Sequence, residues 1–178
     1  MRIKHTLLVL LLACIFSGCA ITHSPSANCA SYQTCFSPDG GCANAIIGEL
    51  GKAKTEVLVQ AYYLTAPDIV QALVDAHKRG IHVEVILDSK SNVTREDSSK
   101  EVVSQAGIPT YIDAAHPISH NKTMIIDKEI VVTGSYNFTK NAERNAENLL
   151  ILRSNALASE YIQNWELHRK HSSDYKAN

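Results

Sequence analysis

A strand, a helix and a second strand follow one another between residues 57 and 87, and this pattern limits the folds open to the chain. A short apolar run covers Val57 to Ala61, and it is followed by apolar residues at helical spacing: Ile69, Val70, Leu73 and Val74. Gly80 predicts the end of that helix, and Ile81 to Leu87 form a second apolar run. Such a unit builds parallel strands joined by a right-handed crossover. We therefore expect an α/β fold.

The rest of the chain predicts a mixed β-sheet sandwiched between helices. Thr65 has the position of a helix N-cap, because Asp68 follows it three residues later. Apolar spacing predicts further helices over residues 43–50, 100–106 and 155–170 and further strands over residues 110–112, 130–133 and 149–152. The length of 178 residues suits a single globular domain, which we expect to span residues 32–178.

The N-terminus resembles a secretory signal peptide over residues 1–19. Arg2 and Lys4 precede ten apolar residues, which is too few to span a bilayer, since spanning takes about 20. Small residues before Cys19 resemble a lipoprotein signal, in which Cys19 would be lipidated; ordinary cleavage nearby, after Ala20, is the alternative. Residues 20–31 have the composition of a linker. The mature protein is expected to be exported, as a periplasmic protein, a membrane-anchored lipoprotein or a secreted protein.

The net charge restricts how the protein can bind nucleic acid, and the cysteine spacing restricts disulfides and zinc sites. The formal net charge is −1, which argues against broad electrostatic coating of nucleic acid but leaves a local basic patch open. Cys29, Cys35 and Cys42 could form one disulfide in an oxidising compartment and leave one free thiol. Their spacing contains no C-x-x-C pair, so a zinc site at these cysteines is disfavoured.

Polar side chains are concentrated between His120 and Asn137. If His120 begins a strand, it shares a face with Lys122, and an imidazole beside an ammonium suits an anion. Asp127 lies in a predicted hairpin turn, where bonding to backbone groups is its simplest role. Ser135 and Asn137 carry neutral donors that could bind phosphate oxygens, although Gly-Ser-x-Asn is also common in turns and helix caps.

The spacing His-x-Lys, four residues, Asp, six residues, Gly-Ser-x-Asn is similar to the signature of the phospholipase D superfamily. The resemblance to its small, single-motif bacterial members, endonucleases of the Nuc type, extends from about Tyr32 to the C-terminal helix. It includes the segments TAPDIVQALVDAHKRG, SQAGIPTYID, HPISHNKTMIID, VVTGSYNFTKNAE and NAENLLIL.

The resemblance implies a phosphodiesterase that needs no metal or other cofactor and works through a covalent phosphohistidine. His120 matches the nucleophile, and Lys122 and Asn137 match the phosphate clamp, with Ser135 beside them. Glu147 matches the acid that orients the histidine. Asp127 matches the remaining signature position, for which the resemblance implies a structural role.

One histidine cannot be both nucleophile and acid in a single in-line displacement, because the leaving oxygen departs on the side opposite the attack. The chain has one His-x-Lys motif. We therefore expect a homodimer that shares one active site between two copies of His120.

The substrate is expected to be DNA, or RNA, with a phosphatidylcholine-type lipid as the alternative. A nuclease needs cations near the site, and the candidates are Lys90, Arg95, Lys100, Lys128, Lys140 and Arg144. A lipase needs an apolar rim, for which the chain offers Tyr62, Tyr63, Leu64, Tyr136 and Phe138.

Three other functions are less well supported. His116 and His120 have the spacing of a helical metal site, but Pro117 between them disfavours a helix. A serine hydrolase at Ser135 lacks the Gly-x-Ser-x-Gly elbow. A non-catalytic module that binds nucleic acid or membrane would be expected to lack one of the signature residues, and none is missing. The simplest role of the other histidines is at the surface or in packing: His23, His82, His168 and His171.

Overall fold

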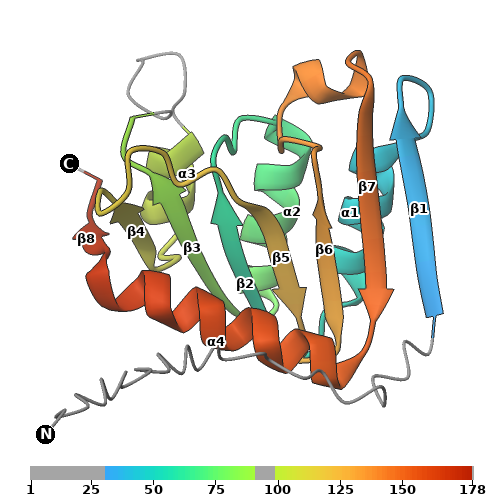
Figure 1. The fold of residues 1–178 in the computed structure, drawn as a ribbon. Coiled ribbons are helices and arrows are strands. Elements are labelled where there is room, and N and C mark those ends of the chain that lie inside the picture. Colours follow the sequence, from blue (N-terminus) through green and yellow to red (C-terminus); the bar gives the residue numbers. More distant parts are fainter. Residues whose placement is uncertain (1–30, 91–98, 178) are drawn as a thin grey trace, which may run out of the picture.

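One mixed sheet of eight strands forms the centre of the protein in a computed structural model that describes residues 31–90 and 99–177. The strand order is β1-β7-β6-β5-β2-β3-β4-β8 (Figure 1). The strands are β1 (Ser31–Ser37), β2 (Glu56–Ala61), β3 (His82–Asp88), β4 (Thr110–Asp113), β5 (Lys122–Ile126), β6 (Ile130–Gly134), β7 (Glu147–Arg153) and β8 (Ser173–Tyr175). The predicted signal peptide, with Cys19, and also Cys29 and Arg95 lie outside the described residues.

Helices cover both faces of this sheet, as predicted. One face is covered by α1 (Cys42–Lys52), α2 (Pro67–Lys78) and α3 (Ser99–Gln105), and α4 (Asn155–His171) crosses the other (Figure 1). A short 3-10 helix, η1 (Lys140–Glu143), precedes β7. No helix of the described residues has the length and apolarity needed to cross a bilayer.

The predicted strand-helix-strand unit is present as β2-α2-β3, with β2 and β3 parallel and Val57 paired with Val83. Alternating side chains of β2 pack into two separate hydrophobic cores, one on each face of the sheet. Val57 and Val59 belong to the large core beneath α1 and α2, whereas Leu58 packs in a smaller core beneath α4 with Trp165. The Trp165 indole also donates a hydrogen bond to the Val59 carbonyl at 3.0 Å. Strand β2 is thus fixed on both faces.

The two edge strands were not predicted. β1 begins at Ser31, the last residue of the predicted linker, and buries only Cys35 and Ser37. β8 has three residues, none of them buried. Both strands owe their place to backbone pairing, with β7 and β4 respectively, and not to an apolar run.

The predicted N-cap at Thr65 was wrong. Ala66 is the N-cap of α2 and makes no side-chain cap bond, and Pro67 begins the helix. The backbone amides of Thr65 and Ala66 instead donate to the carbonyl of Phe138, each at 2.9 Å. These bonds fix the start of α2 to the segment that follows β6.

Cys35 and Cys42 are both buried free thiols. Burial, reinforced by Cys35 and Glu143, raises the pKa of Cys42 to about 12. The Cys42 thiol therefore stays protonated at neutral pH and is a poor nucleophile.

Asp127 holds the hairpin between β5 and β6 against the start of β2. Asp127 and Lys128 both have positive φ, at 54° and 57°, and the Glu129 amide donates to the Ile126 carbonyl, so the predicted turn is present. The Asp127 carboxylate accepts bonds from three backbone amides and one hydroxyl, at 2.7–3.2 Å: Lys54, Thr55 and Glu56 N–H and Thr55 Oγ1.

These bonds predict that Asp127→Asn lowers the free energy of unfolding by about 2 kcal/mol at pH 7, because bonds to a charged acceptor are replaced by weaker ones. Burial alone would raise the pKa of Asp127, but the hydrogen bonds lower it below its ordinary value. The stabilisation is therefore complete above the ordinary aspartate pKa of about 4 and is lost as the pH falls through the folded-state pKa.

Urea unfolding at pH 7 and pH 3 measures both effects. The difference between wild type and Asp127→Asn should shrink at pH 3. Glu129→Gln, in the same turn and exposed, is the matched control and should change stability by less than about 0.5 kcal/mol. An equal loss in the two variants would contradict the prediction.

Candidate active site

Four strand ends meet at one edge of the sheet and form an open pocket. The pocket lies where β5 and β7 begin and where β6 ends, beside the end of β2. Its volume is about 430 Å³, and its lining residues are His120, Lys122, Gly134, Ser135, Asn137 and Glu147. The structure therefore brings together every predicted polar site residue except Asp127. We call this cavity the His120 pocket.

His120 lies in the loop before β5 and not on the strand, which begins at Lys122. The two side chains nevertheless lie side by side, as predicted. The Lys122 ammonium is 3.0 Å from His120 Nδ1 and donates to the His120 carbonyl at 2.7 Å. Burial lowers the pKa of Lys122, and the negative charge of Glu147 opposes this shift.

The contact with Lys122 bears on the tautomer of His120. An ammonium only donates, so a charged Lys122 requires His120 Nδ1 to be an acceptor, and the proton of a neutral ring is then on Nε2. The ring of Tyr62, which follows β2, packs against the imidazole with centroids 4.6 Å apart. The Lys122 ammonium also lies 5.2 Å from the centre of the Tyr62 ring. From the sequence, Tyr62 was considered only for an apolar rim, and its packing against the histidine was not predicted.

Glu147 forms a short hydrogen bond with Ser135, a contact that was not predicted. Its carboxylate accepts from the Ser135 hydroxyl at 2.6 Å and from the Asn145 amide at 3.1 Å. Ser135 Oγ in turn accepts from the backbone amide of Asn148 at 3.0 Å. Within the described part of the chain, the bonds of Glu147 go to these neighbours and not to His120. Its predicted role in orienting the histidine stays a prediction.

Gly134 sets the geometry at the end of β6. Its φ is 150°, and a Cβ there would lie 2.2 Å from the Asn148 carbonyl oxygen, closer than atoms can approach. This close approach lets the amides of Ser135 and Tyr136 both donate to that same oxygen, at 3.1 and 3.2 Å. The backbone thus fixes where Ser135 enters the His120 pocket.

The Asn137 side chain lines the pocket with an unused acceptor. Its Oδ1 is buried and has no hydrogen-bond partner among the described residues. Thr139, and not Asn137, caps η1, by accepting from the Ala142 amide at 3.2 Å. An unsatisfied buried polar atom is costly in a folded protein, so Asn137 Oδ1 lacks a donor that a stable environment would supply.

Several predicted candidates lie away from this pocket. Asp127 and Lys128 are at the opposite end of β5 from His120, so Lys128 was wrongly placed among the cations near the site. Lys90 reaches the loop before His120 and donates to the Pro117 carbonyl at 3.0 Å.

Three histidines lie together in a cluster that was not predicted. The contacts of His116 are not with His120 but with Asp113, His168 and His171, so two histidines assigned to the surface or to packing belong to a cluster.

Comparison with known proteins agrees with the geometry. Residues 46–168 match the family model described as cardiolipin synthase, PLD-like domain. A phospholipase D of Rickettsia typhi is 41% identical over 142 residues, which is 79% of this chain and 69% of that protein.

Two solved structures are similar over nearly their whole length. The crystal structure of the phospholipase D family member Nuc from Salmonella typhimurium has a TM-score of 0.79 and 36% identity, covering 82% of this chain and 98% of that one. NucT from Helicobacter pylori has a TM-score of 0.74 and 22% identity, covering 82% and 99%, and supports the fold.

The family match over most of the chain, the identity to its relatives and the shared fold agree with the pocket that holds His120 and Lys122. The chain belongs to the phospholipase D superfamily and is a phosphodiesterase of the hydrolase class.

Proposed function

We propose that the protein is a metal-independent endonuclease that hydrolyses DNA, or RNA, through a phosphohistidine. The resemblance of its sequence to small endonucleases of the Nuc type supports this substrate. The chemistry rests on side chains alone: the cation of Lys122 and the polar side chains of Ser135 and Asn137 line one pocket with the His120 imidazole.

The polar lining of the His120 pocket is the observation that carries the choice of nucleic acid over lipid. Every side chain that lines it is polar. Most of the residues that could have formed an apolar rim are buried in the core instead, with no exposed surface: Leu64, Tyr136 and Phe138. Tyr62 and Tyr63 stay partly exposed, and aromatic rings can stack on bases.

A phospholipase D acting on lipid is the second candidate. Two observations favour it: the name of the Rickettsia typhi relative, and the 54% exposure of Ile118, an apolar side chain two residues before His120. One exposed isoleucine offers little area to an acyl chain, and we therefore rank lipid second.

In the proposed reaction, an imidazole nitrogen of His120 attacks phosphorus and the bond to the leaving oxygen breaks. The leaving oxygen takes a proton from an acid on the far side. Water then attacks the phosphohistidine and gives a proton to the far-side group, which restores the acid and releases the phosphate monoester and the free imidazole. For Nε2 to attack, the ring proton must be on Nδ1, so Lys122 has to leave Nδ1, and the substrate phosphate offers its ammonium a stronger acceptor.

The second acid is proposed to come from another copy of the chain. His120 is the one imidazole in the lining of the pocket among the described residues, and both His120 and Ser135 are exposed. A two-fold axis through this edge would place a second His120 on the opposite side of one phosphate. The homodimer would then share a single active site.

Export is part of the proposal. The order of charged, apolar and small residues in the first nineteen positions supports a signal peptide, and Cys19 is the proposed site of lipid attachment. The enzyme would then act in the periplasm or at a membrane surface, or as a secreted protein.

The substrate is tested by incubating the protein, in excess EDTA, with plasmid DNA, single-stranded DNA, RNA and phosphatidylcholine vesicles. We expect cleavage of nucleic acid, and a loss of roughly a thousandfold or more in His120→Ala, because the nucleophile is removed. Circular dichroism in EDTA separates loss of chemistry from unfolding. His82→Ala, an exposed histidine on β3, is the matched control and should retain activity. Hydrolysis of lipid alone would overturn the choice of substrate. A folded enzyme that EDTA inactivates and that Mg²⁺ or Ca²⁺ reactivates would overturn metal independence.

The shared site is tested with heterodimers purified through two different tags. A heterodimer of wild type with His120→Ala should be nearly inactive, because each turnover needs both imidazoles. Independent sites would leave about half of the activity. Heterodimers of wild type with His82→Ala should be fully active. Activity that sediments with a monomer would refute the dimeric site.

A further inference from the structure

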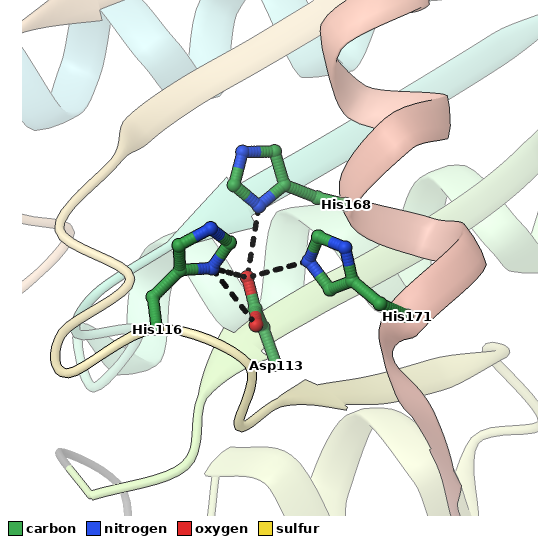
Figure 2. Close-up of side chains that lie close together, drawn as sticks. All are labelled: Asp113, His116, His168 and His171. Atoms are coloured by element: carbon green, nitrogen blue, oxygen red, sulfur yellow. Dashed lines mark hydrogen bonds and ion pairs between the residues drawn. The ribbon is translucent and has the colours of Figure 1, made fainter.

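Three histidines converge on one buried carboxylate outside the His120 pocket. Asp113 is the last residue of β4, His116 lies in the loop after it, and His168 and His171 lie in the last turn of α4 (Figure 2). One possible ligand atom from each residue lies within 4.8 Å of the others. We call these four residues the Asp113 cluster.

In the Asp113 cluster, three imidazoles approach the same carboxylate oxygen. One oxygen, Asp113 Oδ2, lies 2.8 Å from His168 Nδ1, 3.2 Å from His116 Nδ1 and 3.4 Å from His171 Nε2. The three imidazole rings are 5.0–5.2 Å apart, centroid to centroid, so each ring is beside both others. One carboxylate oxygen has about two lone pairs, fewer than the three imidazoles around Oδ2, and three adjacent imidazoles would repel one another if they were protonated.

The cluster has the donors of a zinc site. Zn²⁺ binds imidazole nitrogen and carboxylate oxygen in a tetrahedron, and bonds of about 2.0–2.1 Å place the ligand atoms about 3.3 Å apart. The distances from Asp113 to His116 and His171 are already near this value, that to His168 would lengthen slightly, and the ring nitrogens now lie within 4.8 Å of one another.

Two of the four side chains are partly exposed, so a metal ion could reach the cluster from solvent. The Asp113 side chain is fully buried, whereas those of His116 and His171 are 43% and 36% exposed. Burial would raise the pKa of Asp113, but bonds from His168, the Ala115 amide, His116 and His171 lower it to about 2. The carboxylate is therefore ionised at neutral pH.

We propose that Asp113, His116, His168 and His171 bind one Zn²⁺ ion as a structural site. Four protein ligands close a tetrahedron and leave no open position for catalysis, which agrees with a structural role. The ion would not take part in chemistry at His120, so this inference does not depend on the proposed substrate or on metal-independent hydrolysis.

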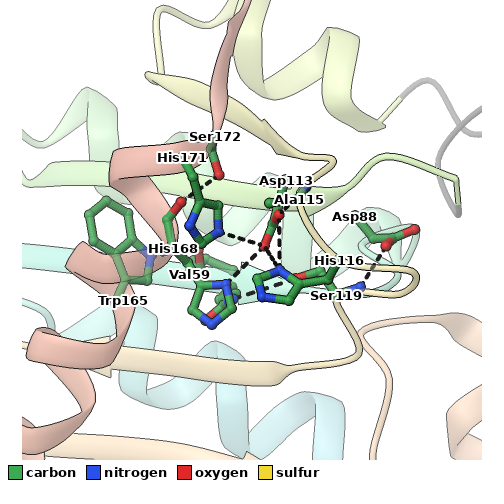
Figure 3. A network of polar contacts seen from close by, with 11 residues as sticks. Val59, Asp88, Asp113, Ala115, His116, Ser119, Trp165, His168, His171 and Ser172 are labelled. Carbon is green, nitrogen blue, oxygen red and sulfur yellow. Dashed lines mark hydrogen bonds and ion pairs between the residues drawn. The ribbon is translucent and has the colours of Figure 1, made fainter.

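The ion would fasten the loop that carries the nucleophile to α4. His116 is four residues before His120 on the same loop. A second attachment lies between them, where the Ser119 amide donates to Asp88 Oδ2 at 2.8 Å (Figure 3). Zinc at the Asp113 cluster would restrict the part of the loop before this attachment.

Zinc binding is tested on the dimer-competent protein purified without a polyhistidine tag. After removal of metal with EDTA and dialysis, the protein is exposed to ZnCl₂, passed through gel filtration and analysed for metal by mass spectrometry. We expect about one zinc per chain and a rise in Tm of about 5 °C or more. His116→Ala and His171→Ala, both at exposed positions, should fold but lose the zinc and the rise in Tm, and His82→Ala should keep both. Equal zinc contents in all variants, or none in wild type, would refute the site.

Replacing Zn²⁺ with Co²⁺ identifies which side chains bind the metal. Co²⁺ in the same site should show the visible absorption of a tetrahedral complex, without the charge-transfer band of a thiolate ligand. A thiolate band would assign the metal to Cys35 and Cys42 instead and overturn the proposal.

Amide hydrogen exchange tests the effect on the loop. Zinc should slow exchange in residues 114–119 of wild type and have no such effect in His171→Ala. Unchanged exchange in zinc-loaded wild type would overturn the role of the ion in restraining the loop.

Discussion

The antiparallel pairing of β2 with β5 joins two differently built halves of the sheet. On one side of it, β2, β3 and β4 are parallel; on the other, β5, β6, β7 and β1 are antiparallel. The register pairs Ala61 with Lys122, and Tyr62, the next residue, therefore meets His120. At the other end of the same pairing, the Asp127 carboxylate binds the chain just before and at the start of β2. A slip of one residue would turn Lys122 away from the pocket.

Much of the interior could be predicted because its side chains are apolar and periodic. The expected elements are present: the strand over Val57–Ala61, the helix that contains Ile69 and Leu73, and the helix predicted over residues 155–170. Edge strands are different. β1 and β8 are held by backbone bonds that depend on where β7 and β4 lie, and a sequence of mostly exposed residues carries no record of that pairing.

In the site too, a pattern within one segment could be predicted, whereas a contact between distant segments could not. That His120, Lys122, Ser135 and Asn137 meet in one pocket could be expected because they lie in one short stretch whose spacing resembles a known signature, and Glu147 was added by the same resemblance. Their roles in catalysis stay predictions. The Asp113 cluster was missed, although Asp113 and His116 are three residues apart and so are His168 and His171. Each pair alone is commonplace. Their meeting depends on α4 ending beside β4, which is a property of the topology and not of either segment.

The absence of a side chain at Gly134 makes the spacing of two pocket residues a property of the backbone. Because one carbonyl oxygen of β7 receives two successive amides of the chain leaving β6, main-chain bonds set the separation of Ser135 from Glu147. A larger residue at position 134 would push β6 away from β7 and change that separation even if Ser135 and Glu147 were both kept.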